Sequence, residues 1–147
     1  MMAGMNISSY FEIPVHELEK AMAFYRAVFG HALERDSVDG NEMAFFPYAE
    51  GAPGSSGALA QGDSYVPGKS GARVYFDVPD IQDTLRRAVA AGGAVRYPET
   101  AVGAFGFVAE LEDLDGNCIG LRAAAASRQD PDAEPALPMP SHGENVS

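Results

Sequence analysis

The first clear pattern in the chain is an alternation of apolar and polar residues in ISSYFEIPV, residues 7–15. β-branched and aromatic residues that alternate in this way predict a strand with one buried face. Successive side chains of a strand point to opposite sides of a sheet, so every second residue shares a face. We therefore expect one face to carry Phe11, Ile13 and Val15, and the other to carry Tyr10 and Glu12.

The pattern changes to helical spacing over residues 17–29, where apolar residues recur every three or four positions. Gly30 follows as the expected residue that ends the helix. Two strand-like runs come next, at 42–46 and 57–60. A stretch rich in Gly, Pro and Ser, residues 62–71, then predicts a connector.

The same order of elements then repeats. The sequence YFDVP at 75–79 matches YFEIP at 10–14, with three identical and two similar residues. A second helix is predicted, with Asp80 as its N-cap, an apolar stripe of Ile81, Leu85, Ala88 and Val89, and Gly92-Gly93 at its end. Strand-like runs follow at 94–97, 107–111 and 118–122, the last two joined by a turn at 115–117. We infer that the chain contains an internal duplication.

Four segments carry a family resemblance: 17–25 (ELEKAMAFY), 28–30 (VFG), 91–93 (AGG) and 112–117 (EDLDGN). With the duplication, they resemble the glyoxalase/bleomycin-resistance/dioxygenase superfamily, also called the vicinal oxygen chelate (VOC) superfamily. The resemblance spans 6–123 and implies an α+β fold of two tandem βαβββ modules, about 6–61 and 72–123, whose curved sheets form a half-barrel cleft. Residues 124–147 hold Ala, Pro and acidic residues, and we expect a flexible tail there.

The resemblance implies that the sheet faces turned away from the helices line the cleft. In the second copy, alternation places Val74, Phe76 and Val78 under the helix and Arg73, Tyr75 and Asp77 in the cleft. The expected ligand-binding residues are Tyr10, Glu12, Arg73, Tyr75, Asp77, Phe105 and Glu110. Two tyrosines across one cleft favour a small organic ligand, because each ring is apolar with a polar tip. The Gly-rich segments 51–57 and 103–106 are interpreted as cleft rims, with Phe105 as an aromatic lid or a core residue.

Metal-dependent relatives place one His, Glu or Gln ligand on each of four strands. The resemblance assigns these positions to Tyr10, Arg73, Gly120 and a site near Ala58 or Leu59. None of these is a ligand, and an arginine opposes a bound cation, so we expect the usual metal to be missing. One alternative keeps a divalent ion, held by Glu12 and Asp77 together; in the other, one or both of these acids pair with Arg73.

Two functional hypotheses follow. The first is a metal-independent binder of small organic molecules, similar to the drug-sequestering members of the family. The second is a glyoxalase-like lyase, isomerase or dioxygenase-type enzyme. In the second, Glu12 is a general base with a pKa raised by a buried neighbour, Asp77, or both acids are metal ligands. The resemblance also implies a homodimer, sometimes with swapped modules.

Composition narrows the range of partners. The formal net charge of −11 opposes binding to nucleic acid or to an anionic membrane surface. The single cysteine, Cys118, excludes an internal disulfide and gives no sign of an oxidising compartment. The sequence shows no signal peptide and no apolar segment of transmembrane length, so we expect a cytoplasmic protein.

Overall fold

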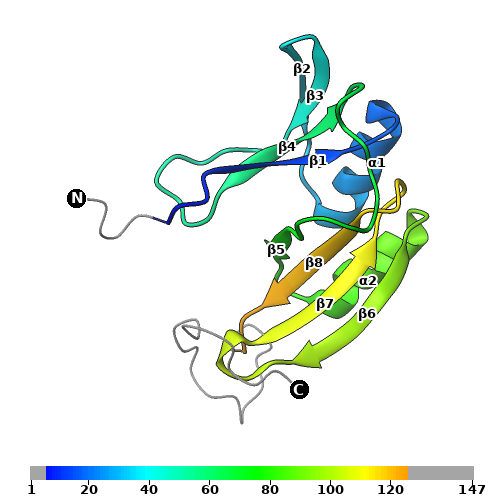
Figure 1. The fold of residues 1–147 in the computed structure, drawn as a ribbon. Helices are drawn as coiled ribbons and strands as arrows, with labels where there is room; N and C mark the ends of the chain where they lie inside the picture. Colours follow the sequence, from blue (N-terminus) through cyan, green and yellow to red (C-terminus); the bar gives the residue numbers. More distant parts are fainter. Residues whose placement is uncertain (1–5, 126–147) are drawn as a thin grey trace.

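The protein is described here for residues 6–125 in a computed structural model (Figure 1). Module 1 contains β1 (Tyr10–Pro14), α1 (Leu18–Phe29), β2 (Glu34–Val38), β3 (Asn41–Phe45) and β4 (Ser56–Gln61). Module 2 contains β5 (Tyr75–Asp77), α2 (Ile81–Ala90), β6 (Ala94–Ala101), a short 3-10 turn η1 (Gly103–Phe105), β7 (Phe107–Glu112) and β8 (Cys118–Ala123). The predicted flexible tail lies outside the described residues from 126 onward.

Each module forms one four-stranded sheet, in the order β1-β4-β3-β2 for module 1 and β5-β8-β7-β6 for module 2. The first strand of each module runs parallel to the last, and the other neighbours are antiparallel. Both helices lie on the same side of the two sheets (Figure 1). This is the α+β fold of two tandem modules that the sequence predicted. No helix within residues 6–125 is long and apolar enough to cross a bilayer.

The predicted helix ends are confirmed. Gly30 adopts a left-handed conformation (φ 80°), and its N–H donates to the carbonyl of Arg26. Asp80 accepts a hydrogen bond from the N–H of Asp83 at 3.1 Å, as an N-cap does. The predicted apolar stripe of α2 is wrong at one position. Val89 is exposed, and Thr84 is buried in its place because positions 81, 84, 85 and 88 share the inner face.

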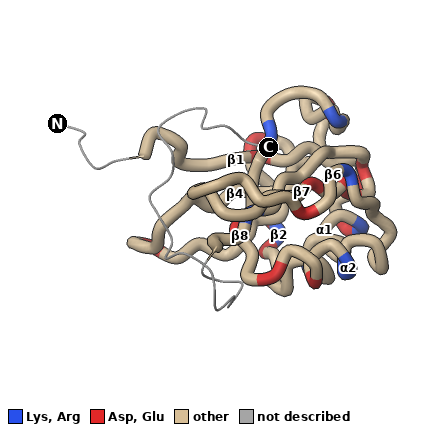
Figure 2. The backbone as a smooth tube through the Cα atoms, turned by 90° about the horizontal axis from the view of Figure 1, so that it is seen from below, with Lys and Arg blue, Asp and Glu red and all other residues tan. Residues whose placement is uncertain are grey.

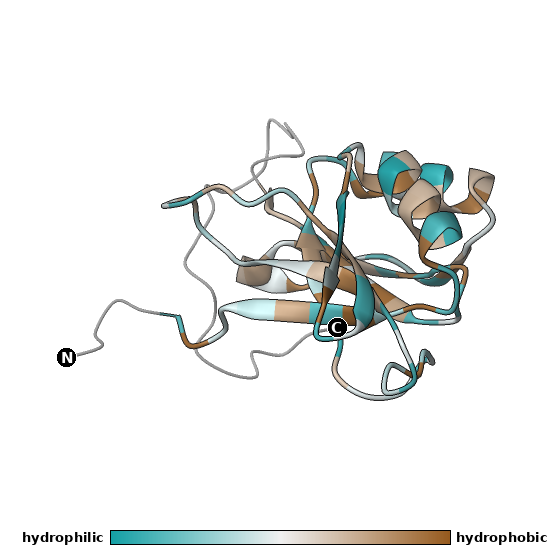
Figure 3. Cartoon of the chain, turned by 90° about the horizontal axis from the view of Figure 1, so that it is seen from above, coloured by the Kyte–Doolittle hydropathy of each residue, from teal (hydrophilic) through white to brown (hydrophobic). Residues whose placement is uncertain are grey.

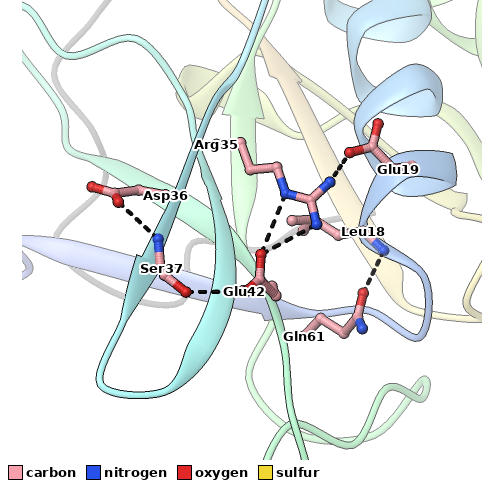
Figure 4. A network of polar contacts seen from close by, with 7 residues as sticks. All are labelled: Leu18, Glu19, Arg35, Asp36, Ser37, Glu42 and Gln61. Atoms are coloured by element: carbon pink, nitrogen blue, oxygen red, sulfur yellow. Dashed lines mark hydrogen bonds and ion pairs between the residues drawn. The ribbon is translucent and has the colours of Figure 1, made fainter.

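The sequence analysis missed β2, because its residues ERDSV are polar and every one of them is exposed. The usable signal was the Asp39-Gly40 pair that turns the chain into β3. Both residues have positive φ, at 53° and 78°, as a two-residue hairpin loop requires. Figure 4 shows Arg35 on the helix side of β2, bonded to Glu19 of α1 and to Glu42 of β3, while Asp36 points the other way.

One core serves both modules. Phe11 of β1 and Phe76 of β5 occupy matching positions and contact each other, with ring centroids 5.7 Å apart. Phe76 also stacks on Phe29 of α1 at 4.5 Å. The predicted helix-facing positions are confirmed for both strands except Val74, which is half-buried and lies outside the core cluster. In Figure 3, hydrophilic and hydrophobic residues alternate along the strands and helices. This is expected when each element has one face on the core and one face away from it.

A buried polar network joins module 2 to module 1. Asp113 accepts hydrogen bonds from the Tyr25 hydroxyl at 2.6 Å and from two backbone N–H groups of the turn that follows, those of Asp115 and Asn117. The side chain of Asn117 donates onward to the carbonyl of Pro14 at 2.8 Å. Burial and the Asp113 carboxylate raise the pKa of Tyr25 well above its ordinary value. The predicted turn at 115–117 is therefore also a joint between the modules.

Candidate functional site

The sheet faces turned away from the helices hold five of the seven predicted binding residues, Tyr10, Glu12, Tyr75, Asp77 and Glu110. We call these faces open face 1, in module 1, and open face 2, in module 2. Pairing register places on open face 1 the residues Tyr10, Glu12, Met43, Phe45, Ala58 and Ala60. By the same register, open face 2 carries Tyr75, Asp77, Tyr97, Glu110, Cys118, Gly120 and Arg122. Matching residues of β1 and β5 thus lie on corresponding faces.

On open face 1, the carboxylate of Glu12 is held by two tyrosine hydroxyls. Tyr10 donates to Oε2 at 2.9 Å, and Tyr65 donates to Oε1 at 2.7 Å. The sheet beneath them is apolar: Met43, Ala58 and Ala60 form a small buried cluster, and Tyr65 packs against it. We call this cluster the apolar floor. Burial, then the bond to Glu12, raises the pKa of Tyr10 to about 12. The hydrogen bond that Tyr65 itself donates to Glu12 is the largest cause of the raised pKa of Tyr65.

Tyr65 was missed by the sequence analysis. It lies in the connector after β4, where no regular pattern indicates which way a side chain points. The signal available was a lone aromatic residue within a segment of small and polar residues.

On open face 2, arginines neutralise the acids. Arg73 donates to Glu110 at 3.0 Å, and Arg122 donates to Asp77 at 3.2 Å. The Cys118 thiol donates to the other oxygen of Glu110 at 3.3 Å. Burial, followed by this contact, raises the pKa of Cys118. Basic and acidic segments accordingly lie close together around β6 and β7 in Figure 2.

Phe105, the predicted lid, lies in the η1 turn against the sheet. The guanidinium of Arg122 sits over its ring, 4.6 Å from the centroid, and Arg122 Nε donates to the Phe105 carbonyl at 3.0 Å. Phe105 therefore contacts Arg122 through both its ring and its carbonyl. A role of Phe105 in ligand binding stays a prediction. Arg122 itself was missed, because in the sequence it is one polar residue at the end of an apolar strand.

The structure separates two acids that the sequence analysis expected to face each other. Glu12 lines a crevice of about 410 Å³ beneath the connector, together with Lys69 and Cys118. Asp77 lines another of about 450 Å³ beside the loop at 53–56. Neither acid contacts the other among the described residues, and Arg73 pairs with neither. Glu12 is exposed, so the buried like-charge pair required by the general-base hypothesis is not formed.

A larger groove lies at the end of the module 1 sheet, where Tyr10 pairs in register with Ser56. Its volume is about 760 Å³, and we call it the tyrosine groove. The residues that line it include Tyr10, Glu34, Phe45, Pro47, Tyr48, Ser56 and Gly57. Tyr10 belongs to both sites, because its ring lines the groove and its hydroxyl reaches Glu12. The predicted rim at 51–57 thus contributes to a groove within module 1.

The residues do not fit the metal ion of the family. Tyr10, Arg73 and Gly120 stand at the positions that the resemblance assigns to ligands, and Ala58 and Leu59 are fully buried. A Cβ atom at Gly120 would lie 2.5 Å from Cδ2 of Tyr75, so the tyrosine ring fills the space where a ligand side chain would begin. Within residues 6–125, no three His, Cys, Asp or Glu side chains gather closely enough to hold a metal.

Several solved structures share this fold. The antibiotic-binding protein TnmS3 from Streptomyces sp. CB03234 is 26% identical, with a TM-score of 0.62 over 82% of this chain and 98% of that one. A glyoxylase/bleomycin resistance protein/dioxygenase domain from Frankia sp. EAN1pec is 18% identical, with a TM-score of 0.63 over 82% and 99%. Glyoxalase I from Zea mays is 20% identical, with a TM-score of 0.60 over 78% of this chain and 44% of the maize chain.

No curated protein sequence matches the chain. The family model described as Glyoxalase/Bleomycin resistance protein/Dioxygenase superfamily matches residues 7–121, from just before β1 into β8. Its extent agrees with the two modules seen in the structure. The chain therefore belongs to the glyoxalase/bleomycin resistance protein/dioxygenase superfamily.

Proposed function

We propose that this protein binds a small organic molecule on its open faces, and that it does so without a metal ion. The observation that carries the proposal is the exposure of tyrosine rings on these faces and in the adjoining tyrosine groove. Tyr10, Tyr48, Tyr75 and Tyr97 are 47%, 74%, 45% and 40% exposed. By contrast, Phe11, Phe29, Phe46 and Phe76 pack against the shared core. A tyrosine ring offers apolar area and a hydroxyl at low entropic cost, which suits a flat organic ligand.

The metal-free part of the proposal is supported by the contact between Tyr75 and Gly120. The ring of Tyr75 covers the glycine where metal-dependent relatives carry a glutamate, and it leaves no room for that side chain. The acids nearby are engaged as well, Glu110 by Arg73 and Asp77 by Arg122. An aromatic surface replaces the ligand set, and such a surface binds by contact area rather than by coordination.

Similarity to an antibiotic-binding protein supports binding rather than turnover. TnmS3 is 26% identical to this chain and is covered almost completely by it. The enzyme hypothesis relied on Glu12 and Asp77 acting together, and these acids line separate crevices. We also propose a homodimer, as the family resemblance implies. Sedimentation velocity would detect it.

The proposal is tested with a thermal-shift screen of small aromatic and polycyclic compounds, run on protein before and after treatment with EDTA. We expect hits whose shift in melting temperature is the same in both preparations. Tyr75→Ala should weaken those that bind open face 2, because it removes a ligand-contacting ring. Val89→Ala is the control, since Val89 is exposed to a similar degree, 53% against 45%, but lies on α2.

Two results would overturn the proposal. The first is a stoichiometric divalent ion in purified protein, detected by elemental analysis, whose removal abolishes binding. The second is a screen in which no compound shifts the melting temperature and no open-face amide signal moves in NMR titrations.

A further inference from the structure

We infer that open face 1 selects a positively charged organic molecule, an amine or quaternary ammonium compound, with Glu12 as its counter-ion and the tyrosine groove as the site for its apolar part. This inference rests on the proposed binding function and narrows it to one ligand class. The argument starts from a difference between the two copies of the duplicated strand.

The two copies hold their central acid in different ways. Glu12 in β1 is paired in register with Ala58, whereas Asp77 in β5 is paired with Arg122. The position that supplies a cation in module 2 therefore supplies a methyl group in module 1. Asp77 is neutralised within its own sheet, while Glu12 has no cation beside it on the neighbouring strand.

The Glu12 carboxylate is held in place by two hydrogen bonds. Both of its partners are hydroxyl donors, and a carboxylate has about four lone-pair sites, so room to accept from a ligand remains. Within residues 6–125, no Lys or Arg lies within ion-pair distance of Glu12. Lys69 lines the same crevice without pairing with it. A preorganised anion of this kind lowers the cost of binding a cation.

The surroundings favour an organic cation over a metal ion. Tyr10 and Tyr65 contact the carboxylate through their hydroxyls, and Tyr65 packs with Phe45 against the apolar cluster of Met43, Ala58 and Ala60. Aromatic faces attract ammonium groups, whereas Mg²⁺ and Ca²⁺ require several oxygen ligands. The rest of the face adds to the attraction, because Glu34 and Asp36 of β2 pair in register with Phe45 and Met43.

The geometry also links the charged site to a place for the rest of the ligand. Tyr10 donates to Glu12 and lines the tyrosine groove of about 760 Å³. A molecule with an ammonium group at Glu12 can therefore extend its apolar part along Tyr10 towards Tyr48. The volume lies in the usual range for pockets that bind small molecules.

The test uses three probes of similar shape and different charge: phenethylammonium, 2-phenylethanol and 3-phenylpropionate. Each is titrated into ¹⁵N-labelled protein, and amide shifts on β1, β3 and β4 give the dissociation constant. We expect the ammonium probe to bind about tenfold more tightly than the alcohol, the scale of one cation–π or ion-pair contact. The carboxylate probe should bind most weakly. Added salt should weaken binding of the ammonium probe, because it screens the attraction to Glu12, and should leave the alcohol unchanged.

Glu12→Gln should bring the ammonium and alcohol probes to within about twofold of each other. Glu19→Gln is the matched control, because it removes the same charge on the helix side and should preserve the difference. Glu12 is exposed, so its substitution is expected to leave the fold intact. Tyr65→Phe, which removes one of the two hydroxyls that hold the carboxylate in place, provides a second variant and should reduce the ammonium preference partially.

The outcomes separate the two proposals. Equal affinity for the ammonium and alcohol probes in the wild type would overturn the charge selection and leave small-molecule binding standing. A preference that persists in Glu12→Gln would overturn the role of Glu12. No binding by any of the three probes would also count against this inference, while the broader compound screen would then decide whether the proposed function survives.

Discussion

The two modules have the same strand order and a shared core, yet their open faces are built on different principles. On open face 2, Arg73 and Arg122 neutralise Glu110 and Asp77. On open face 1, Glu12 is held by the neutral hydroxyls of Tyr10 and Tyr65. Open face 2 is thus internally balanced, and open face 1 presents a fixed negative charge over an apolar floor.

The contrast shows which part of a duplicated module is free to diverge. Helix-facing residues meet the other module, as Phe11 meets Phe76, so a change there disturbs both halves. Open-face residues meet solvent or their own sheet. A single difference, Ala58 against Arg122, is enough to change the electrostatics of a face without altering the core. Function in this chain is therefore expected on the faces where the copies differ.

The largest expected effect comes from breaking the joint that makes the two modules one unit. Asp113→Ala removes the acceptor for Tyr25 and for two backbone N–H groups in a buried site. We expect a loss of about 3–5 kcal/mol in the free energy of unfolding, because buried donors lose their partner. Urea denaturation measures it, with the exposed Asp63→Ala as control.

The joint also predicts how unfolding proceeds. Both modules should unfold in one transition in wild type and variant, because they share a core. Two separate transitions, followed by NMR signals from each module, would mean that the modules are independent and that the comparison concerns two domains.

A smaller effect is expected from removing the balance of open face 2. Arg122→Ala deletes the hydrogen bond to the Phe105 carbonyl, the contact with its ring and the pair with Asp77. We expect a loss of about 1–2 kcal/mol, most of it from the Phe105 contacts, because Asp77 is largely exposed and its pair is screened. Arg86→Ala, on the surface of α2, should cost less than about 0.5 kcal/mol. Equal losses in the two variants would show that Arg122 is only a surface charge.

The smallest expected effect is a change in the pKa of the tyrosines on open face 1, which tests how the two faces differ. The pKa of Tyr10 is raised from 10.0 to about 12 in the folded protein. Tyr10 therefore stabilises the folded state fully below pH 10, and this stabilisation is lost as the pH rises through 12. Glu12→Gln should lower the pKa of Tyr10 and Tyr65, because it removes the nearby negative charge. Ring ¹³C NMR titration measures each tyrosine separately.

Tyr75 is the internal control for that titration. Its pKa is raised mainly by burial and then by the charge of Glu110, which lies on the same open face 2. Glu12→Gln should therefore leave Tyr75 unchanged. A parallel shift of Tyr75 would reveal that the two faces are coupled, contrary to the comparison.

Much of the fold could be predicted because its signals are local. Alternation within five residues assigned Ile13 and Val78 to the core, and Gly30 and Asp80 marked helix ends through their own backbone preferences. The edge strand β2 was missed because all of its residues are polar and exposed. Without a buried face, a strand shows no alternation of apolar and polar residues. The Asp39-Gly40 turn was the remaining signal for it.

The duplication, the family and the sides of the strands could be inferred from the sequence, since each depends on residues close together in the chain. The partners of the acids became clear in the folded structure. Glu12 meets Tyr65 across 53 residues, and Asp77 meets Arg122 across 45. Such contacts depend on where whole strands and connectors come to lie, and no local period encodes that. For this reason Tyr10, Glu12, Tyr75 and Asp77 could be placed on open faces from sequence, while the charge balance of each face could not.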